Sequence, residues 1–225
     1  MILDMNSRSL KIIVAFVILF CATNNAQAAS LNIIQIYKKI PARYFVHGTV
    51  VADPYARITF LKKEKYPPNT LDTANYYLSV SMEDEADDTF SSDAEKGHEV
   101  ALFINGTTPT IAVSSFDCGL WCPPLKQKIV FLQPEGAEWK DVTLKILKTS
   151  EKNNMMNTCI VDYKKQQQEL SSATRAGALY HCKRYLRYRL PQHGTTIHVF
   201  NQDTPFYKFE WSNGSFHGSE WSNPN

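Results

Sequence analysis

Glycine is scarce in this chain and never forms a phosphate-binding pattern. The nine glycines among 225 residues make neither a Gly-x-Gly-x-x-Gly fingerprint nor a Walker loop. No serine lies in a Gly-x-Ser-x-Gly elbow, and no two of the six histidines stand four residues apart, as they do in zinc-binding helices. The sequence thus has no motif for nucleotide binding, serine hydrolysis or zinc catalysis, and we predict neither a cofactor nor a metal.

A strong charge of one sign is also lacking. The formal net charge is +2 at pH 7, and it falls to +1 when Asp4, Arg8 and Lys11 leave with the signal peptide described next. Nucleic-acid binding depends on a basic surface that neutralises phosphates. We therefore predict no nucleic-acid partner.

A long apolar run occurs once, near the N-terminus. Basic residues precede an apolar run from Ile12 to Ala22, and the small residues Ala26 and Ala28 follow it. This order is typical of a secretory signal peptide, which we assign to residues 1–28. The run is about half of the roughly 20 residues that span a bilayer. We expect residues 29–225 to form a single exported domain, periplasmic or secreted, with no integral membrane segment after signal removal.

Cysteines are few, and their number suits an oxidising compartment. Removal of Cys21 with the signal peptide leaves Cys118, Cys122, Cys159 and Cys182. An even number of cysteines in an exported chain predicts two disulfides. Proximity in sequence favours Cys118 with Cys122 and Cys159 with Cys182, while pairings that join the two halves of the chain stay open.

The stretch "FDCGLWCPP" holds the first two of these cysteines. Three residues separate Cys118 from Cys122, whereas thioredoxin-like redox pairs are separated by two and begin a helix. A zinc site needs about four ligands, and Cys159 and Cys182 do not form a second pair. We interpret the stretch as a disulfide-closed connection between two strands.

Alternation of apolar and polar residues, typical of β-strands, dominates the chain. In the N-terminal half, we predict strands over residues 42–51, 57–61, 76–82, 99–104, 109–115 and 128–133. From Tyr180 onward, further alternating segments and the turn at Asn213-Gly214 predict a three- or four-stranded antiparallel meander. The predicted fold class is mainly β, α+β at most, with antiparallel meanders or a sandwich, disulfide bonds and one or two short helices.

Helical patterns are weaker. We predict one helix over residues 157–176, where helix-forming residues are frequent. Residues 139–147 fit either a short strand or a helical turn. A subdivision of the domain near residues 148–157 is left open.

Charged residues gather in two segments. Residues 83–97 are predicted to form an exposed acidic loop, because seven acids and no base occupy the first thirteen positions. The candidate contact residues in this loop are Glu83, Asp84, Glu85, Asp87 and Asp88. Seven bases lie between Lys164 and Arg189, against one acid. Both segments also fit ordinary solvated surfaces.

The basic segment includes "YHCKRYLRYRL", in which aromatic and basic residues alternate. On a strand, Tyr185, Arg187 and Arg189 would share one face. Such a face can hold an anionic glycan or an acidic protein surface through cation-π contacts and charge-assisted hydrogen bonds. It can equally be the solvated face of a sheet.

Two segments, "ALFING...IAVSSFDCGLWCPPLKQKIVFLQPEGAEWKDVTLKIL" (residues 101–147) and "YRLPQHGTTIHVF...FYKFEWSNGSF" (residues 188–216), resemble small uncharacterised exported proteins of Gram-negative bacteria. In those proteins a two-cysteine turn joins two strands, and a Leu-Pro-x-x-Gly-Thr strand leads to a closing aromatic strand. The resemblance covers about half of the mature chain. It implies one β-rich architecture in the bacterial envelope and no particular activity, so it transfers no catalytic or binding residue.

These features favour a non-catalytic binding protein, such as an inhibitor or immunity-type partner of another envelope or secreted protein. A hydrolase of cell-wall or glycan substrates is the alternative, with the carboxylates Glu135, Glu138 and Asp141 near Trp139. A thiol-disulfide protein is the second alternative. Whether the protein is an enzyme stays uncertain, with the balance leaning against catalysis, and we assign no catalytic residue.

Overall fold

The strands form two antiparallel sheets, which confirms the predicted mainly β fold class. The computed structural model describes residues 32–63, 69–82, 96–105, 108–117, 126–167, 174–202 and 204–222. The six-stranded sheet contains, in spatial and chain order, β1 (Thr70–Asp72), β2 (Tyr77–Ser81), β3 (Lys96–Asn105), β4 (Thr108–Asp117), β5 (Lys126–Glu135) and β6 (Glu138–Asp141). The four-stranded sheet contains β7 (Leu186–Arg189), β8 (Thr196–Asn201), β9 (Thr204–Ser212) and β10 (Ser215–Glu220).

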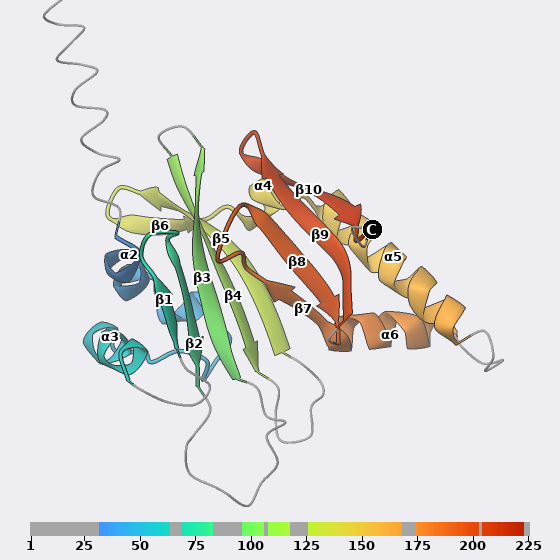
Figure 1. Ribbon diagram of the computed structural model, residues 1–225, viewed down its shortest axis with the longest axis horizontal. Coiled ribbons are helices and arrows are strands. Elements are labelled where there is room, and N and C mark those ends of the chain that lie inside the picture. The colour runs from blue at the N-terminus through green and yellow to red at the C-terminus, as the bar shows by residue number, and fades with distance from the viewer. Residues whose placement is uncertain are drawn as a thin grey trace, which may run out of the picture.

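Helices lie at both ends of this pair of sheets (Figure 1). The N-terminal helices are α2 (Ile33–Lys39), the 3-10 helix η1 (Ala42–Tyr44) and α3 (Pro54–Leu61). The later helices are α4 (Thr143–Ile146), α5 (Thr149–Gln166) and α6 (Arg175–Tyr185). Across the described ranges, no helix is both long and apolar enough to cross a membrane.

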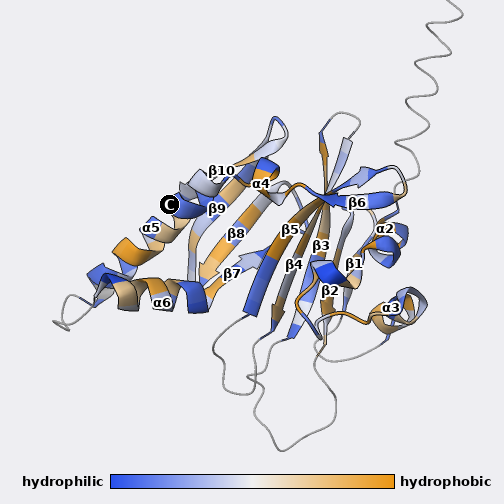
Figure 2. Cartoon of the chain, turned by 180° about the vertical axis from the view of Figure 1, so that it is seen from behind, coloured by the Kyte–Doolittle hydropathy of each residue, from blue (hydrophilic) through white to orange (hydrophobic). Residues whose placement is uncertain are grey.

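The central strands β3, β4 and β5 are buried on both faces. Ile111, Val113 and Val130 pack with the N-terminal helices on one face. Ala112 and Phe131 point the other way, into a second core that includes the four-stranded sheet, α5 and α6. Figure 2 shows hydrophobic residues along the middle of β5 and β8 and hydrophilic residues where β5 begins. The six-stranded sheet is therefore the middle layer of the molecule.

The N-terminal region differs from the sequence prediction. The strand predicted over 57–61 is wrong, because these residues belong to the helix α3. The Asp53 side chain accepts hydrogen bonds from the backbone N–H groups of Tyr55 and Ala56, and Pro54 occupies the first turn. This N-cap and proline favour a helix start, and they outweigh the β-branched residues that follow.

The strand predicted over residues 42–51 is also wrong. A 3-10 helix occupies its start, and the chain then turns at Gly48, where φ is +79°. The apolar residues that produced the alternation pack individually, since Phe45 is buried in the core while Val50 is only half-buried. Short apolar runs in a packed loop thus mimic the period of a strand.

The single helix predicted over residues 157–176 is replaced by two helices. The helix α5 begins earlier, at Thr149, and α6 begins at Arg175 after the N-cap Thr174, whose hydroxyl accepts from the N–H of Gly177 at 3.1 Å. Because α6 extends to Tyr185, the strand expected from Tyr180 begins only at Leu186. The C-terminal meander itself is confirmed, with four strands.

Candidate functional site

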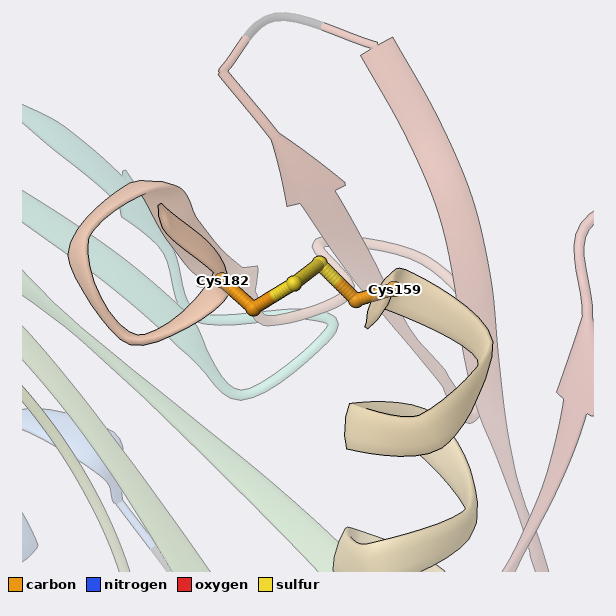
Figure 3. The surroundings of a disulfide bond; sticks show 2 residues. All are labelled: Cys159 and Cys182. Carbon is orange, nitrogen blue, oxygen red and sulfur yellow. A yellow bond between two sulfur atoms is a disulfide. The ribbon is translucent and has the colours of Figure 1, made fainter. Parts of the chain in front are cut away.

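A disulfide joins the two C-terminal helices. Cys159 of α5 and Cys182 of α6 are bonded, with their Cα atoms 6.0 Å apart (Figure 3). Both side chains are fully buried. This pairing confirms one of the two predicted bonds and excludes the alternatives that used these cysteines. Cys118 and Cys122 lie outside the described residues, so their bond stays a prediction that thiol counting on the denatured, unreduced mature protein tests.

The strand β7 and the turn after it cross one face of the six-stranded sheet. The hydroxyl of Ser114 in β4 donates to the carbonyl oxygen of Tyr188 at 3.0 Å. The carboxylate of Glu99 in β3 accepts from the backbone N–H of Leu190 at 2.7 Å. Beyond them, Gln192 donates to Asp72 at 3.2 Å. Side chains of the larger sheet therefore fix the edge of the smaller one.

Glu99 is the buried acid at this crossing, and it is 8 % exposed. Burial raises the pKa of its carboxyl above the ordinary value, while the Leu190 N–H, Arg187 and Arg189 oppose this rise. Burial and the neighbouring Glu99 carboxylate also raise the pKa of Tyr77. We call Glu99, Ser114, Arg187, Arg189 and Leu190 the β7 junction.

The two arginines of the β7 junction stack on rings from different sheets. Arg187 is half-buried, and its guanidinium lies 4.2 Å from the ring centroid of Phe116 in β4. Arg189 is exposed, and its guanidinium lies 4.8 Å from the ring centroid of Phe200 in β8. Such contacts hold long basic side chains along apolar surface.

Tyr185 is the last residue of α6, whereas the two arginines belong to β7. The structure thus divides the predicted face of Tyr185, Arg187 and Arg189 between a helix end and a strand. The ring of His181 stacks on Tyr163 of α5 and packs against Tyr185, with centroid distances of 4.3 and 4.5 Å. Burial lowers the pKa of His181, a hydrogen bond to Asn201 opposes this effect, and Arg184 adds to it.

Arg184 is the cation that contacts the rings at this helix end. Its guanidinium lies 5.5 Å from the ring centroid of Tyr180 and 5.6 Å from that of Tyr185. It also donates a hydrogen bond to the Tyr180 hydroxyl at 2.8 Å. We call Tyr163, Tyr180, His181, Arg184 and Tyr185 the α6 surface.

A second buried polar cluster lies on the opposite face of the six-stranded sheet. His98 is fully buried in β3, its Nδ1 bonds to the carbonyl oxygen of Thr49, and its Nε2 meets the Tyr37 hydroxyl at 2.7 Å. A carbonyl only accepts, so Nδ1 carries the proton and Nε2 accepts from Tyr37. Burial lowers the pKa of His98 to about 3, the bond to Thr49 opposes this shift, and Arg57 adds to it.

Arg57 is buried beside this histidine, with 1 % of its surface exposed. Its guanidinium donates to the carbonyl oxygens of Val51, Tyr37 and Ile40 at 3.0, 2.9 and 2.7 Å. Tyr37 and Ile40 lie at the C-terminal end of α2, where the helix dipole favours a cation. This cluster joins α2 to α3 and has the character of a structural core.

Other predicted sites have ordinary structural partners, fall outside the described ranges or, like Glu138, are exposed on a strand. Near Trp139, the Glu135 carboxylate pairs with Lys140 at 2.6 Å, and Asp141 accepts from the N–H of Thr143 at 2.9 Å. Among the described residues, no three histidines, cysteines or acids gather as metal ligands. The acidic contact residues Glu83, Asp84, Glu85, Asp87 and Asp88 lie outside the described residues.

Comparison with known proteins adds no family. A scan against family models, a search of curated proteins and a search of solved structures each returned no match. Function therefore has to be argued from the chain itself.

The sequence interpretation missed the two buried polar clusters. For Glu99 the signal was present, because its position alternates with Ala101 and Phe103, which face the core. An acid in register with core residues indicates a buried carboxylate. For Arg57 and His98, no sequence signal existed, since their partners lie in distant segments.

Proposed function

We propose that this protein is an exported, non-catalytic binding protein of the bacterial envelope, whose partner is another protein. The observation that carries the proposal is the collection of aromatic rings and cations on α6 and β7, next to a disulfide that ties α6 to α5. Aromatic residues and arginine are the residue types enriched at protein interfaces. The signal-peptide pattern supports the exported location.

The positions of the other candidate groups also favour binding over hydrolysis. Of the carboxylates near Trp139, Glu135 forms an ion pair with Lys140, and Asp141 accepts from the N–H of Thr143, the first residue of α4. The buried Glu99 accepts from a backbone amide and faces cations. Glycosidases place two carboxylates across a substrate cleft, and these groups are committed to structural contacts instead.

Chemical cross-linking in the producing cells tests the proposal. An epitope-tagged chain should form a discrete adduct with another protein after brief formaldehyde treatment. The matched control is the same chain without residues 1–28, which should stay in the cytoplasm and lack that adduct. Identical adduct patterns for both chains would contradict an envelope partner.

A further inference from the structure

The two halves of the basic aromatic region differ in what their arginines interact with. In the β7 junction, Arg187 lies over the buried Phe116, and both Arg187 and Arg189 act on the buried Glu99. Their charges thus serve the crossing of the two sheets. In the α6 surface, Tyr180 is 61 % exposed, and Tyr163, His181, Arg184 and Tyr185 are half-buried. This half offers an exposed ring beside a half-buried cation, which suits it to a partner.

The α6 surface is built as a continuous row of rings and cations. Two pairs of residues are spaced four apart, so the members of each pair lie on one side of the helix: Tyr180 with Arg184, and His181 with Tyr185. Arg184 lies against the rings of Tyr180 and Tyr185. Tyr163 extends the row onto α5 through its stacking on His181.

The charge of this region is positive. The helix α6 contains Arg175, Lys183 and Arg184 and no acid. The last turn of α5 adds Lys164 and Lys165, of which Lys165 lies 4.0 Å from Asp162. Cations arranged around aromatic rings complement carboxylates that approach with their aliphatic stems against the rings.

The surface is also held in place before any partner arrives. Cys182 sits between His181 and Lys183 in sequence, and its bond to Cys159 fixes this turn of α6 on α5. The ring stacking and the bond from Arg184 to the Tyr180 hydroxyl further restrict the side chains. Preorganised side chains lose less conformational freedom on binding, which favours affinity.

We propose that the α6 surface is the contact site for an acidic segment of a partner protein, whereas Arg187 and Arg189 have a structural role. This inference rests on the proposed function and specifies its contact residues and the chemistry of its partner. Arg184 pairs with a partner carboxylate, and Tyr180 and Tyr185 pack against its stem.

The experiment measures binding of a fluorescent peptide of ten glutamates to the mature, oxidised protein at low salt. The double variant Tyr180→Ala/Arg184→Ala should bind it about tenfold more weakly, because truncated aromatic and arginine contacts cause the largest losses at interfaces. The matched control is Lys38→Ala/Tyr55→Ala, which removes another cation-ring pair, 3.5 Å apart, formed by a half-buried lysine of α2 and an exposed tyrosine of α3. These helices lie at the opposite end of the molecule from α6 (Figure 1). The control should stay within about twofold of the unmodified protein. Circular dichroism and thermal unfolding verify that both variants are folded.

Equal weakening by both double variants would overturn the proposal, as would absence of peptide binding by the unmodified protein. Tighter binding of a sulfated oligosaccharide or of phosphatidylglycerol vesicles than of the peptide would also overturn it. The cross-linking experiment distinguishes a failure of this contact site from a failure of the proposed binding function. If the cellular adduct persists in the Tyr180→Ala/Arg184→Ala chain, the binding function stands and this site falls. If peptide binding depends on the α6 surface but no adduct forms, the site stands and the protein-partner function falls.

Discussion

Each face of the six-stranded sheet binds its covering layer through one titratable residue of β3 and one serine of β4. The titratable residue is a histidine on one face and a glutamate on the other. His98 and Glu99 follow one another in β3, and their cross-strand neighbours in β4 are Ser115 and Ser114. His98 and Ser115 bind the N-terminal segment, whereas Glu99 and Ser114 bind β7 and the residue after it. All four side chains are buried.

The difference lies in the charge state that each face favours. On the helix-covered face, Arg57 brings a fixed positive charge, and burial keeps His98 neutral. On the β7 face, an acid meets two arginines, yet burial still raises the pKa of Glu99. A buried charge is retained only where its partners offset the loss of water. The stability contributed by His98 and by Glu99 should therefore depend on pH in opposite ways.

Replacing Arg57 with methionine should give the largest effect. Three carbonyl oxygens would lose their charged donor inside the protein. We expect the free energy of unfolding to fall by about 3 kcal/mol or more. Urea unfolding followed by circular dichroism measures this change. The control is Arg43→Met, an exposed arginine stacked on Tyr44. Similar losses in the two variants would contradict the structural role of Arg57.

Acidification should destabilise the helix-covered face through His98. The folded pKa of about 3 lies below the ordinary 6.5, so the unfolded chain takes up a proton first as pH falls. Stability due to His98 is thus complete above pH 6.5 and is lost as pH falls toward 3, by at most about 1.4 kcal/mol per pH unit. The variant His98→Gln should show a shallower loss between pH 6 and pH 4. Parallel stability profiles would show that His98 does not contribute.

The stability contributed by Glu99 should depend on pH in the opposite direction. Because the folded pKa is raised, the stability that this group contributes is complete below its ordinary pKa of 4.5 and declines as pH rises through the folded value. The decline is limited to about 1.4 kcal/mol per pH unit for one proton. Glu99→Gln keeps an acceptor for the Leu190 N–H and removes the titration. Its stability relative to the unmodified protein should increase from pH 4 to pH 7, and a constant difference would refute the assignment.

Local sequence patterns predicted the sheets better than they predicted what joins them. The strands β3, β4 and β5 follow from short, nearly continuous apolar runs, because their residues contact cores on both faces. The helix α3 was mistaken for a strand, although its Asp53-Pro54 start was readable as a cap. Arg57 and His98 could not be paired from sequence, since 41 positions separate them and only the folded chain brings them together.

The predicted face of Tyr185, Arg187 and Arg189 shows the same limit. Aromatic and basic residue types were read correctly, but alternation was extended through Tyr185, which ends a helix. Helix and strand periods cannot be distinguished over a few residues. Glu99 lies under β7, where Arg187 is half-buried and Arg189 is exposed.

The serine pair offers the smallest and most closely matched comparison between the faces. In Ser115→Ala, the N–H of Val46 loses the hydroxyl oxygen that accepts its bond at 2.9 Å. In Ser114→Ala, the carbonyl of Tyr188 loses a donor at 3.0 Å. We expect losses of about 1 kcal/mol in the free energy of unfolding, with Ser115→Ala the larger, because an unpaired N–H donor is tolerated less well than an under-satisfied carbonyl oxygen. Urea unfolding of the two variants at pH 7 decides this order. A larger loss in Ser114→Ala would mean that β7 is held more tightly than the N-terminal segment.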